Sequence, residues 1–168
     1  MKTPKILIIG NSESGKSTAA RILAQYFSCG WTGTSQIILD KIAGVMCDGH
    51  ISRCEFMRQI KLHPDFGPMF RIFLRDVGNK LRENDPAALA KACLERGPIV
   101  EGVRTMAEFA AGYFLFDLIL WIDAPDTKPN DTDELSQYFA DLTVRNDKDE
   151  AFRHNLIATI EKWVEVRE

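Results

Sequence analysis

The sequence predicts a three-layer α/β domain, with a parallel sheet of about five strands and helices on both faces. Short apolar segments rich in β-branched residues alternate with longer segments that carry apolar residues every three or four positions. The short segments are apolar at nearly every position, as expected for parallel strands buried on both faces. The chain has 168 residues, 45% hydrophobic and 27% charged, so we expect one globular domain over residues 1–168.

Four segments are expected to be strands: three are short apolar runs, and the fourth is a short segment that ends at an Asn-Asp turn. They are residues 5–9, 99–101, 117–123 and 142–145. Residues 28–35 are rich in Gly, Ser and Thr, and we expect a loop there. Residues 124–132 are rich in Pro, Asp and Asn, and residues 124–140 are expected to form a lid-like loop.

The helices are expected where apolar residues recur at helical spacing. They are residues 17–27, 52–61, 69–82, 86–95, 105–113 and 149–166. Residues 36–46 fit a strand or a helix, and a helix from Ile38 onward is favoured. The long helical stretch over residues 38–95 separates the first strand from the next, which predicts an inserted region able to hold a second substrate.

The charge and the apolar runs exclude several classes of protein. Lys and Arg number 21 against 24 Asp and Glu, and a net charge of −3 argues against coating duplex nucleic acid. No apolar run is long enough for a secretory signal or a membrane span. The four cysteines form no C-x-x-C pair, so we expect a cytoplasmic protein with free thiols.

One motif is specific. Residues 10–17 match G-x-x-x-x-G-K-[ST] at every fixed position, between an expected strand and an expected helix. The glycines allow backbone N–H groups to turn around a phosphate, the lysine reaches the β- and γ-phosphates, and the serine hydroxyl ligates Mg²⁺. The residues expected to bind the ATP phosphates are Gly10, Asn11, Ser12, Glu13, Ser14, Gly15, Lys16, Ser17 and Thr18.

Three classes of protein carry such a loop. A GTPase would need the guanine-reading N-K-x-D, which the sequence lacks. A mechanical ATPase would need an Asp-Glu pair at the end of an apolar strand, but residues 98–102 carry the single Glu101. A small-molecule kinase needs this loop, an acid near Mg²⁺ and arginines for the acceptor, and the inserted helical region fits that need.

Three further segments carry a resemblance to a known family. They are residues 70–82 with their arginines, residues 101–104 with Glu108 four positions on, and residues 141–147. Together with the loop at residues 10–17, they resemble the bacteriophage-type deoxynucleoside monophosphate kinases, within the wider family of nucleoside monophosphate and dephospho-coenzyme A kinases. The resemblance implies transfer of the γ-phosphoryl of ATP to a (deoxy)nucleoside monophosphate with Mg²⁺. It also implies small-molecule nucleotide partners and the host cytoplasm if the chain is phage-encoded, and it leaves a monomer and a homodimer open.

The sequence departs from that family at two places. Between Asp123 and Val144 it has Lys128 and no Arg, whereas the family usually supplies arginines from this lid. The strand-end motif begins with Glu101, where an Asp one residue later is more usual. Substitutes for the lid arginines are sought in Arg145, Arg153 or the inserted helices.

The catalytic candidates are Lys16, Arg104, Glu101 and Asp40. Glu101 would hold Mg²⁺ through water, together with Ser17, or orient the acceptor; the alternative is a surface carboxylate. Arg104 would clamp a phosphate, or form an ion pair with Glu108. Asp40 would act as a base near the acceptor, or pair with a neighbouring cation.

The acceptor-binding candidates are Arg104 and three arginines on one side of the helix over residues 69–82: Arg71, Arg75 and Arg82. The three could equally form a solvated face paired with nearby acids. Asn146, in the turn after the last expected strand, is assigned to the adenine side.

Two further alternatives stay open. Cys29, Cys47, His50 and Cys54 have tolerable spacing for zinc but lack paired knuckles. The rival functions are another small-molecule kinase, acting on dephospho-coenzyme A or a modified nucleoside, and a non-catalytic regulatory protein that binds a nucleotide.

Overall fold

A five-stranded parallel sheet forms the centre of the protein. The computed structural model describes residues 3–46, 60, 63–129 and 133–167. Along the sheet the strands stand in the order β2-β3-β1-β4-β5, and every neighbouring pair is parallel. Their bounds are β1 Ile6–Ile9, β2 Trp31–Gly33, β3 Ile99–Glu101, β4 Leu118–Asp123 and β5 Leu142–Arg145.

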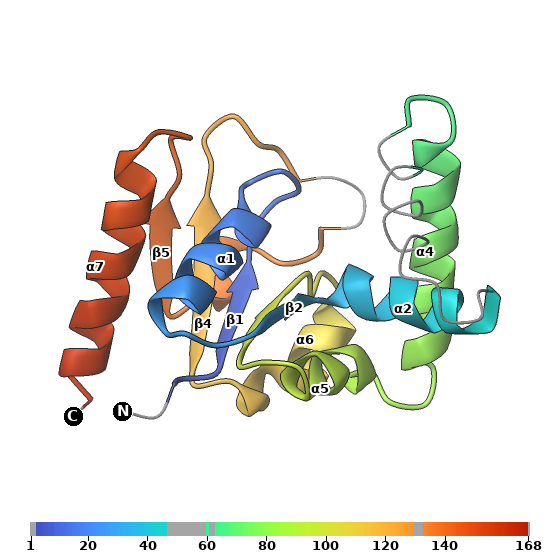
Figure 1. The fold of residues 1–168 in the computed structure, drawn as a ribbon, viewed down its shortest axis with the longest axis horizontal. Coiled ribbons are helices and arrows are strands. Elements are labelled where there is room, and N and C mark those ends of the chain that lie inside the picture. Colours follow the sequence, from blue (N-terminus) through green and yellow to red (C-terminus); the bar gives the residue numbers. More distant parts are fainter. Residues whose placement is uncertain (1–2, 47–59, 61–62, 130–132, 168) are drawn as a thin grey trace.

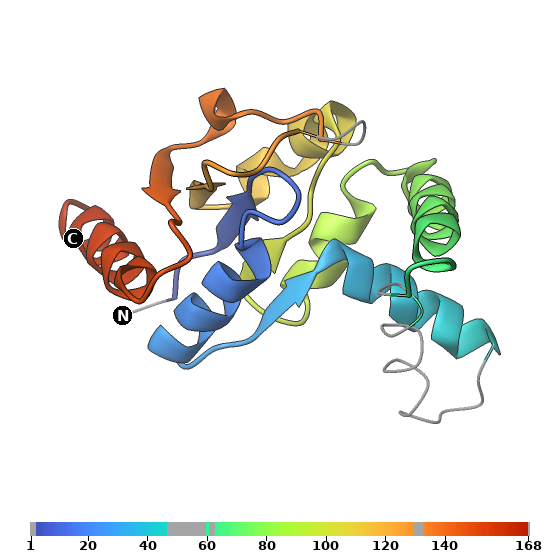
Figure 2. The same ribbon diagram turned by 90° about the horizontal axis from the view of Figure 1, so that it is seen from above.

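Helices cover both faces of this sheet (Figure 1). Helices α1 (Lys16–Tyr26) and α7 (Ala151–Glu165) pack on one face. Helices α2 (Thr34–Met46), α5 (Ala88–Leu94) and α6 (Met106–Gly112) pack on the other, and α4 (Gly67–Arg82) lies outside α2 (Figure 2). Two short 3₁₀ turns lie at Tyr113–Leu115 and Gln137–Phe139. This arrangement confirms the predicted α/β class with three layers.

Strand β1 shows why its sequence is apolar throughout. Ile6 and Ile8 belong to the core under α1 and α7, whereas Leu7 and Ile9 belong to the core under α2 and α5. Successive side chains point to opposite faces of a sheet, so a strand covered on both sides has no solvent-facing position. Burying each such side chain contributes roughly 1.5–3 kcal/mol.

The prediction of a loop over residues 28–35 is wrong at its centre, where β2 forms. This three-residue edge strand pairs with β3 alone, and the side chain of its first residue, Trp31, is exposed. A Cβ at Gly33 would lie 2.5 Å from Glu101 Oε1, so a larger residue here would displace the Glu101 carboxylate. Helix α2 begins directly after β2, at Thr34, four residues before its predicted start.

The other predicted elements agree with the structure to within about three residues, and β3 and β5 agree at both ends. The helix expected over residues 52–61 lies outside the described residues, except for Ile60. In the part of the chain that the structure describes, no helix is both long enough and apolar enough to cross a bilayer.

The topology places a crevice at the carboxyl end of β1. After β1 the chain moves outward to β2 and returns to β3 on one side, and β4 then adds to the other side. In open α/β sheets, ligands bind outside the carboxyl ends of the strands where the strand order reverses in this way. The loop at residues 10–17 follows β1 directly and therefore lies at this point.

Candidate phosphate-binding site

The loop over residues 10–17, here called the P-loop, has the backbone conformation its glycines predict. Gly10 and Gly15 have φ angles of +151° and +94°, which side chains other than Gly rarely tolerate. A Cβ on Gly10 would lie 2.7 Å from the Ile122 carbonyl oxygen of neighbouring β4. Both glycines are thus needed for the loop to close against the sheet before α1 begins at Lys16.

Lys16 is folded into the P-loop. Its Nζ donates a hydrogen bond of 2.8 Å to the Gly10 carbonyl and another to the Asn11 carbonyl, and the residue is 6% exposed. Burial, followed by the positive charge of Arg104, lowers the pKa of Lys16 to about 8. A phosphate beside this ammonium group would relieve both effects, because a nearby negative charge favours the charged form.

A cleft of about 360 Å³ opens beside the loop at the carboxyl edge of the sheet. It brings together residues from the P-loop, α1, the start of α2 and the end of β3. They are Glu13, Gly15, Lys16, Ser17, Thr18, Thr34, Ser35, Glu101, Gly102 and Arg104. Seven of these ten residues were predicted from the sequence, whereas Thr34, Ser35 and Gly102 were not. Thr34 and Gly102 join β2 to β3 here, since the Thr34 hydroxyl donates to the Gly102 carbonyl at 2.9 Å.

Ser17 and Glu101 could hold a magnesium ion together. The Ser17 hydroxyl lies 3.1 Å from Glu101 Oε1, and both residues line the cleft. Mg²⁺ on nucleotides commonly keeps several waters and takes one or two protein oxygens besides the phosphates. This donor pair fits that requirement. Within the described ranges no group of three or more His, Cys, Asp or Glu could hold a metal by itself.

Arg104 lies between the P-loop and the lid-like loop. Its Nη1 donates to the Ser12 hydroxyl at 3.1 Å and to Asp133 Oδ1 at 3.4 Å. The ion pair of Glu108 is formed with Arg82, at 3.4 Å. Arg104 therefore projects toward the phosphate cradle, as its predicted role requires.

Asp133 was not anticipated from the sequence. Its Oδ2 accepts a 2.9 Å hydrogen bond from the Ser12 backbone N–H, and its side chain is 4% exposed. That N–H belongs to the loop whose amides are expected to bind phosphate. The next residue, Glu134, donates its N–H to the Arg104 carbonyl at 3.1 Å, which holds this part of the lid-like loop in place.

The Asp133→Asn variant is expected to bind ATP about three- to tenfold more tightly. The carboxylate occupies a P-loop N–H and would repel the incoming phosphates, whereas the neutral Asn side chain would not. A gain of about 0.7–1.4 kcal/mol corresponds to this change in affinity. Calorimetric titration with ATP and Mg²⁺ measures this change. Asp126→Asn is the matched control, since Asp126 is exposed in the same loop. An unchanged or weaker affinity in the Asp133 variant would contradict the expectation.

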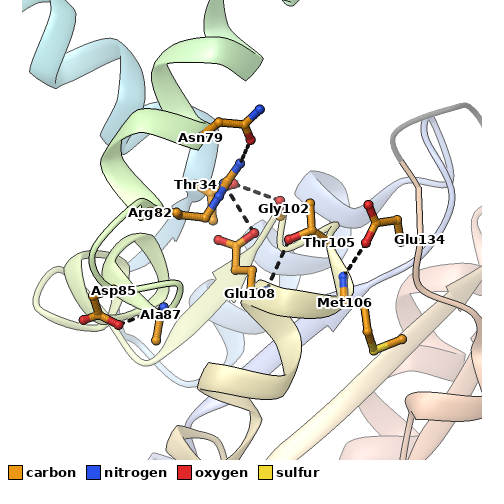
Figure 3. A network of polar contacts seen from close by, with 10 residues as sticks. All are labelled: Thr34, Asn79, Arg82, Asp85, Ala87, Gly102, Thr105, Met106, Glu108 and Glu134. Atoms are coloured by element: carbon orange, nitrogen blue, oxygen red, sulfur yellow. Dashed lines mark hydrogen bonds and ion pairs between the residues drawn. The ribbon is translucent and has the colours of Figure 1, made fainter.

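The three predicted acceptor arginines of α4 separate in the structure. Arg71 and Arg75 are exposed and do not line the cleft, and Arg75 lies 3.5 Å from Asp76. Arg82 points inward to Glu108 of α6 (Figure 3). Helical spacing alone suggested one shared face, but of these three arginines only Arg82 lies where α4 meets α6.

Two other predicted residues have structural partners. Asp40 forms an ion pair with Arg96, accepts a hydrogen bond from Gln36 at 2.8 Å, and does not line the cleft. Asn146 is buried behind the P-loop, where its Nδ2 donates to the Ser14 carbonyl at 2.8 Å and its Oδ1 accepts from the Lys148 N–H. These bonds occupy the amide in supporting the P-loop, so the predicted adenine-side contact is not apparent in this geometry.

The zinc alternative cannot be followed in the structure. Cys47, His50 and Cys54 lie outside the described residues, whereas Cys29 is half-buried with a free thiol. Burial raises the pKa of the Cys29 thiol, which disfavours the thiolate that zinc requires.

Glu108, on α6, is a buried carboxyl group with a raised pKa. Its side chain is 1% exposed, and burial raises its pKa to about 7 despite the opposing charge of Arg82. Its Oε1 has no hydrogen-bond partner among the described residues. An ionised carboxylate in this position costs folding free energy.

The Glu108→Gln variant is expected to lose a pH dependence of stability. The folded protein keeps the Glu108 proton up to about pH 7, whereas the unfolded chain loses it near 4.5. The wild-type free energy of unfolding should therefore fall as pH rises through this window, by up to roughly 3 kcal/mol from this group. Urea unfolding from pH 4.5 to 8 measures the slope. Glu83→Gln, an exposed carboxylate on the same side of the domain, should keep the wild-type slope; equal slopes in all three proteins would contradict this account.

Comparisons with known proteins find no similar sequence but do find a similar solved structure. No protein-family model matches the sequence, and no curated protein matches it. Among solved structures, the chain is similar to the crystal structure of TT1252 from Thermus thermophilus, with a TM-score of 0.45 and 14% identity. That alignment covers 96% of this chain and 98% of TT1252.

Proposed function

We propose that this protein is a nucleotide kinase that transfers the γ-phosphoryl of ATP to a (deoxy)nucleoside monophosphate with Mg²⁺. The observation that carries the proposal is the convergence of Lys16, Ser17, Glu101 and Arg104 on one cleft at the switch point of the sheet. The resemblance of the P-loop and the strand-end segment to nucleoside monophosphate kinases supports the same reaction.

Each of these residues has a role in phosphoryl transfer. The P-loop amides and Lys16 would hold the β- and γ-phosphates, and Arg104 would neutralise charge on the transferred group and the acceptor phosphate. Ser17 and Glu101 would hold Mg²⁺, which bridges the phosphates and offsets developing charge. Because the acceptor is itself a phosphate oxygen, alignment and charge neutralisation supply most of the catalysis and no protein nucleophile is needed.

A regulatory nucleotide-binding protein is the second candidate. The Asp133 carboxylate accepts a hydrogen bond from the Ser12 N–H of the P-loop, which favours this candidate. The absence of arginine from residues 124–140 of the sequence favours it as well. Such a protein would bind ATP in the P-loop without turning it over at a kinase rate. The other small-molecule kinases, including one acting on dephospho-coenzyme A, share the donor site and differ in the acceptor.

A turnover assay with ATP, Mg²⁺ and a panel of nucleoside monophosphates tests the proposal. We expect ADP release that requires both one of the monophosphates and Mg²⁺. ATP with Mg²⁺ should also raise the melting temperature more than GTP does, because only the folded state binds it and the sequence has no guanine-reading motif. Stabilisation by ATP without turnover on any monophosphate would overturn the proposed nucleoside monophosphate kinase activity in favour of the regulatory protein. Phosphorylation of dephospho-coenzyme A instead would show a kinase with another acceptor.

A further inference from the structure

Asn146 reaches from the end of β5 to the back of the P-loop. Its own backbone N–H donates to the carbonyl of Asp123 at the end of β4, and the residue is 6% exposed. Its side-chain Nδ2 donates to the Ser14 carbonyl at 2.8 Å, across 132 positions of sequence. A Cβ on Gly15 would overlap this Nδ2. The amide group therefore packs directly against the peptide bond that joins Ser14 to Gly15.

The orientation of the Asn146 amide is fixed by two hydrogen bonds of opposite polarity. Its Oδ1 accepts from the Lys148 N–H at 3.0 Å, whereas its Nδ2 donates to the Ser14 carbonyl. An amide turned by half a rotation would lose both bonds, because its NH₂ group would face a donor and its oxygen would face an acceptor. Lys148 itself has a φ angle of +61°, which is uncommon outside glycine. The turn after β5 thus holds Asn146 in the orientation that donates to the P-loop.

The bond to the Ser14 carbonyl sets the direction of the Gly15 N–H. In a trans peptide the C=O and N–H groups point in opposite directions, and none of the described peptide bonds is cis. Gly15 lines the phosphate-binding cleft, whereas Asn146 does not. With its carbonyl turned back to Asn146, this peptide therefore directs its N–H toward the side of the loop that carries the cleft.

We propose that Asn146 orients the P-loop for phosphate binding, by holding the Ser14 carbonyl so that the Gly15 N–H faces the phosphates of ATP. Asn146 acts through this peptide and does not touch the ligand, so it is a positioning residue. Backbone donors stabilise an anion most effectively when they are fixed before the anion arrives. This inference rests on the proposed binding of ATP by the P-loop. It replaces the role on the adenine side that the sequence predicted for Asn146.

The Asn146→Asp variant changes the one group that carries the proposal. The introduced carboxylate still accepts from the Lys148 N–H but has no donor for the Ser14 carbonyl, so ATP affinity at pH 8 should fall about tenfold or more. Protonation of the introduced group restores an O–H donor, and burial favours that neutral form. The ratio of wild-type to variant affinity should therefore shrink to about threefold or less at pH 5.5. Calorimetric titration with ATP and Mg²⁺ measures both ratios.

Two controls separate positioning from a general loss of structure. Asn155→Asp makes the same change on the exposed side of α7 and should keep the wild-type affinity at both pH values. Comparing the two proteins at each pH removes the titration of Lys16 and of ATP, which both proteins share. The melting temperature without nucleotide confirms that each protein is folded during the titration. No loss of affinity in the Asn146 variant, or an equal loss at both pH values, would overturn the proposal.

A measurement on the wild-type protein covers the case in which the Asn146 variant does not fold. In isotopically labelled protein, ATP with Mg²⁺ should shift the Gly15 amide resonance downfield, because this N–H gains a charged acceptor. A Gly15 resonance that stays in place while ATP binds would overturn the proposal, and the proposed function would stand. A wild-type protein that binds no ATP would overturn the function itself.

Discussion

Replacing Lys16 with alanine is expected to lower phosphoryl transfer about a hundred- to a thousandfold or more. Loss of one preorganised donor to the developing charge costs roughly 3–4 kcal/mol in the transition state. Lys16 is the buried cation of the cleft, held by the carbonyls of Gly10 and Asn11 beside the phosphate cradle. The rate of ADP formation at saturating ATP, with Mg²⁺ and the preferred monophosphate, measures the effect.

The same variant should fold at least as well as the wild type. Burial and Arg104 lower the pKa of Lys16 to about 8, so the charged ammonium opposes folding at neutral pH. The melting temperature without nucleotide should therefore not fall, whereas the stabilisation by ATP should shrink. Lys162→Ala on α7 is the control for loss of a lysine elsewhere. A Lys16 variant within tenfold of wild-type turnover would show that the P-loop does not act on the transferred phosphate.

The convergence of residues on the cleft could be predicted from the sequence because it follows from parallel strand geometry. The P-loop follows β1, and Glu101 ends the neighbouring β3, so both lie at the same edge of the sheet. Strand β3 could be predicted from its short apolar run, and β5 from a short segment that ends at the Asn146-Asp147 turn. The strand β2 could not, because its three residues owe their conformation to pairing with β3 rather than to local pattern.

The polar partners within the site could not be predicted from spacing. Asp133 reaches the Ser12 N–H across 121 positions of sequence, and such a contact depends on the path of a long loop. Arg82 shares a helix face with Arg71 in the sequence, yet its pairing with Glu108 is set by where α4 meets α6. Helical periodicity predicts the direction in which a side chain points around the helix axis. It does not predict which part of the helix contacts a neighbouring element.

Arg104 joins the P-loop to the lid-like loop at the edge of the cleft. Its guanidinium lies between the Ser12 hydroxyl of the P-loop and the Asp133 carboxylate of the lid-like loop. Its side chain remains 41% exposed, so it can reach into the cleft that it lines. Lys128 is exposed in the lid-like loop, and a flexible ammonium group cannot reproduce the planar, bidentate contact of a guanidinium with a phosphate.

Arg104→Ala is therefore expected to lower kcat/KM for the monophosphate by about 2–4 kcal/mol in transition-state terms, the cost of losing one preorganised donor. ATP affinity, measured by calorimetric titration with Mg²⁺, should change far less, because the P-loop and Lys16 hold that ligand. Arg104→Lys should recover only a small part of the loss. Arg153 was a candidate substitute for the lid arginines, but it donates to Gln25 Oε1 at 3.3 Å and does not line the cleft, so Arg153→Ala should behave as wild type. A variant that keeps its kcat/KM, or that loses ATP affinity instead, would place the acceptor phosphate away from Arg104. A loss confined to the monophosphate identifies a residue of the acceptor site, whereas a loss of ATP affinity identifies one that only supports the P-loop through Ser12.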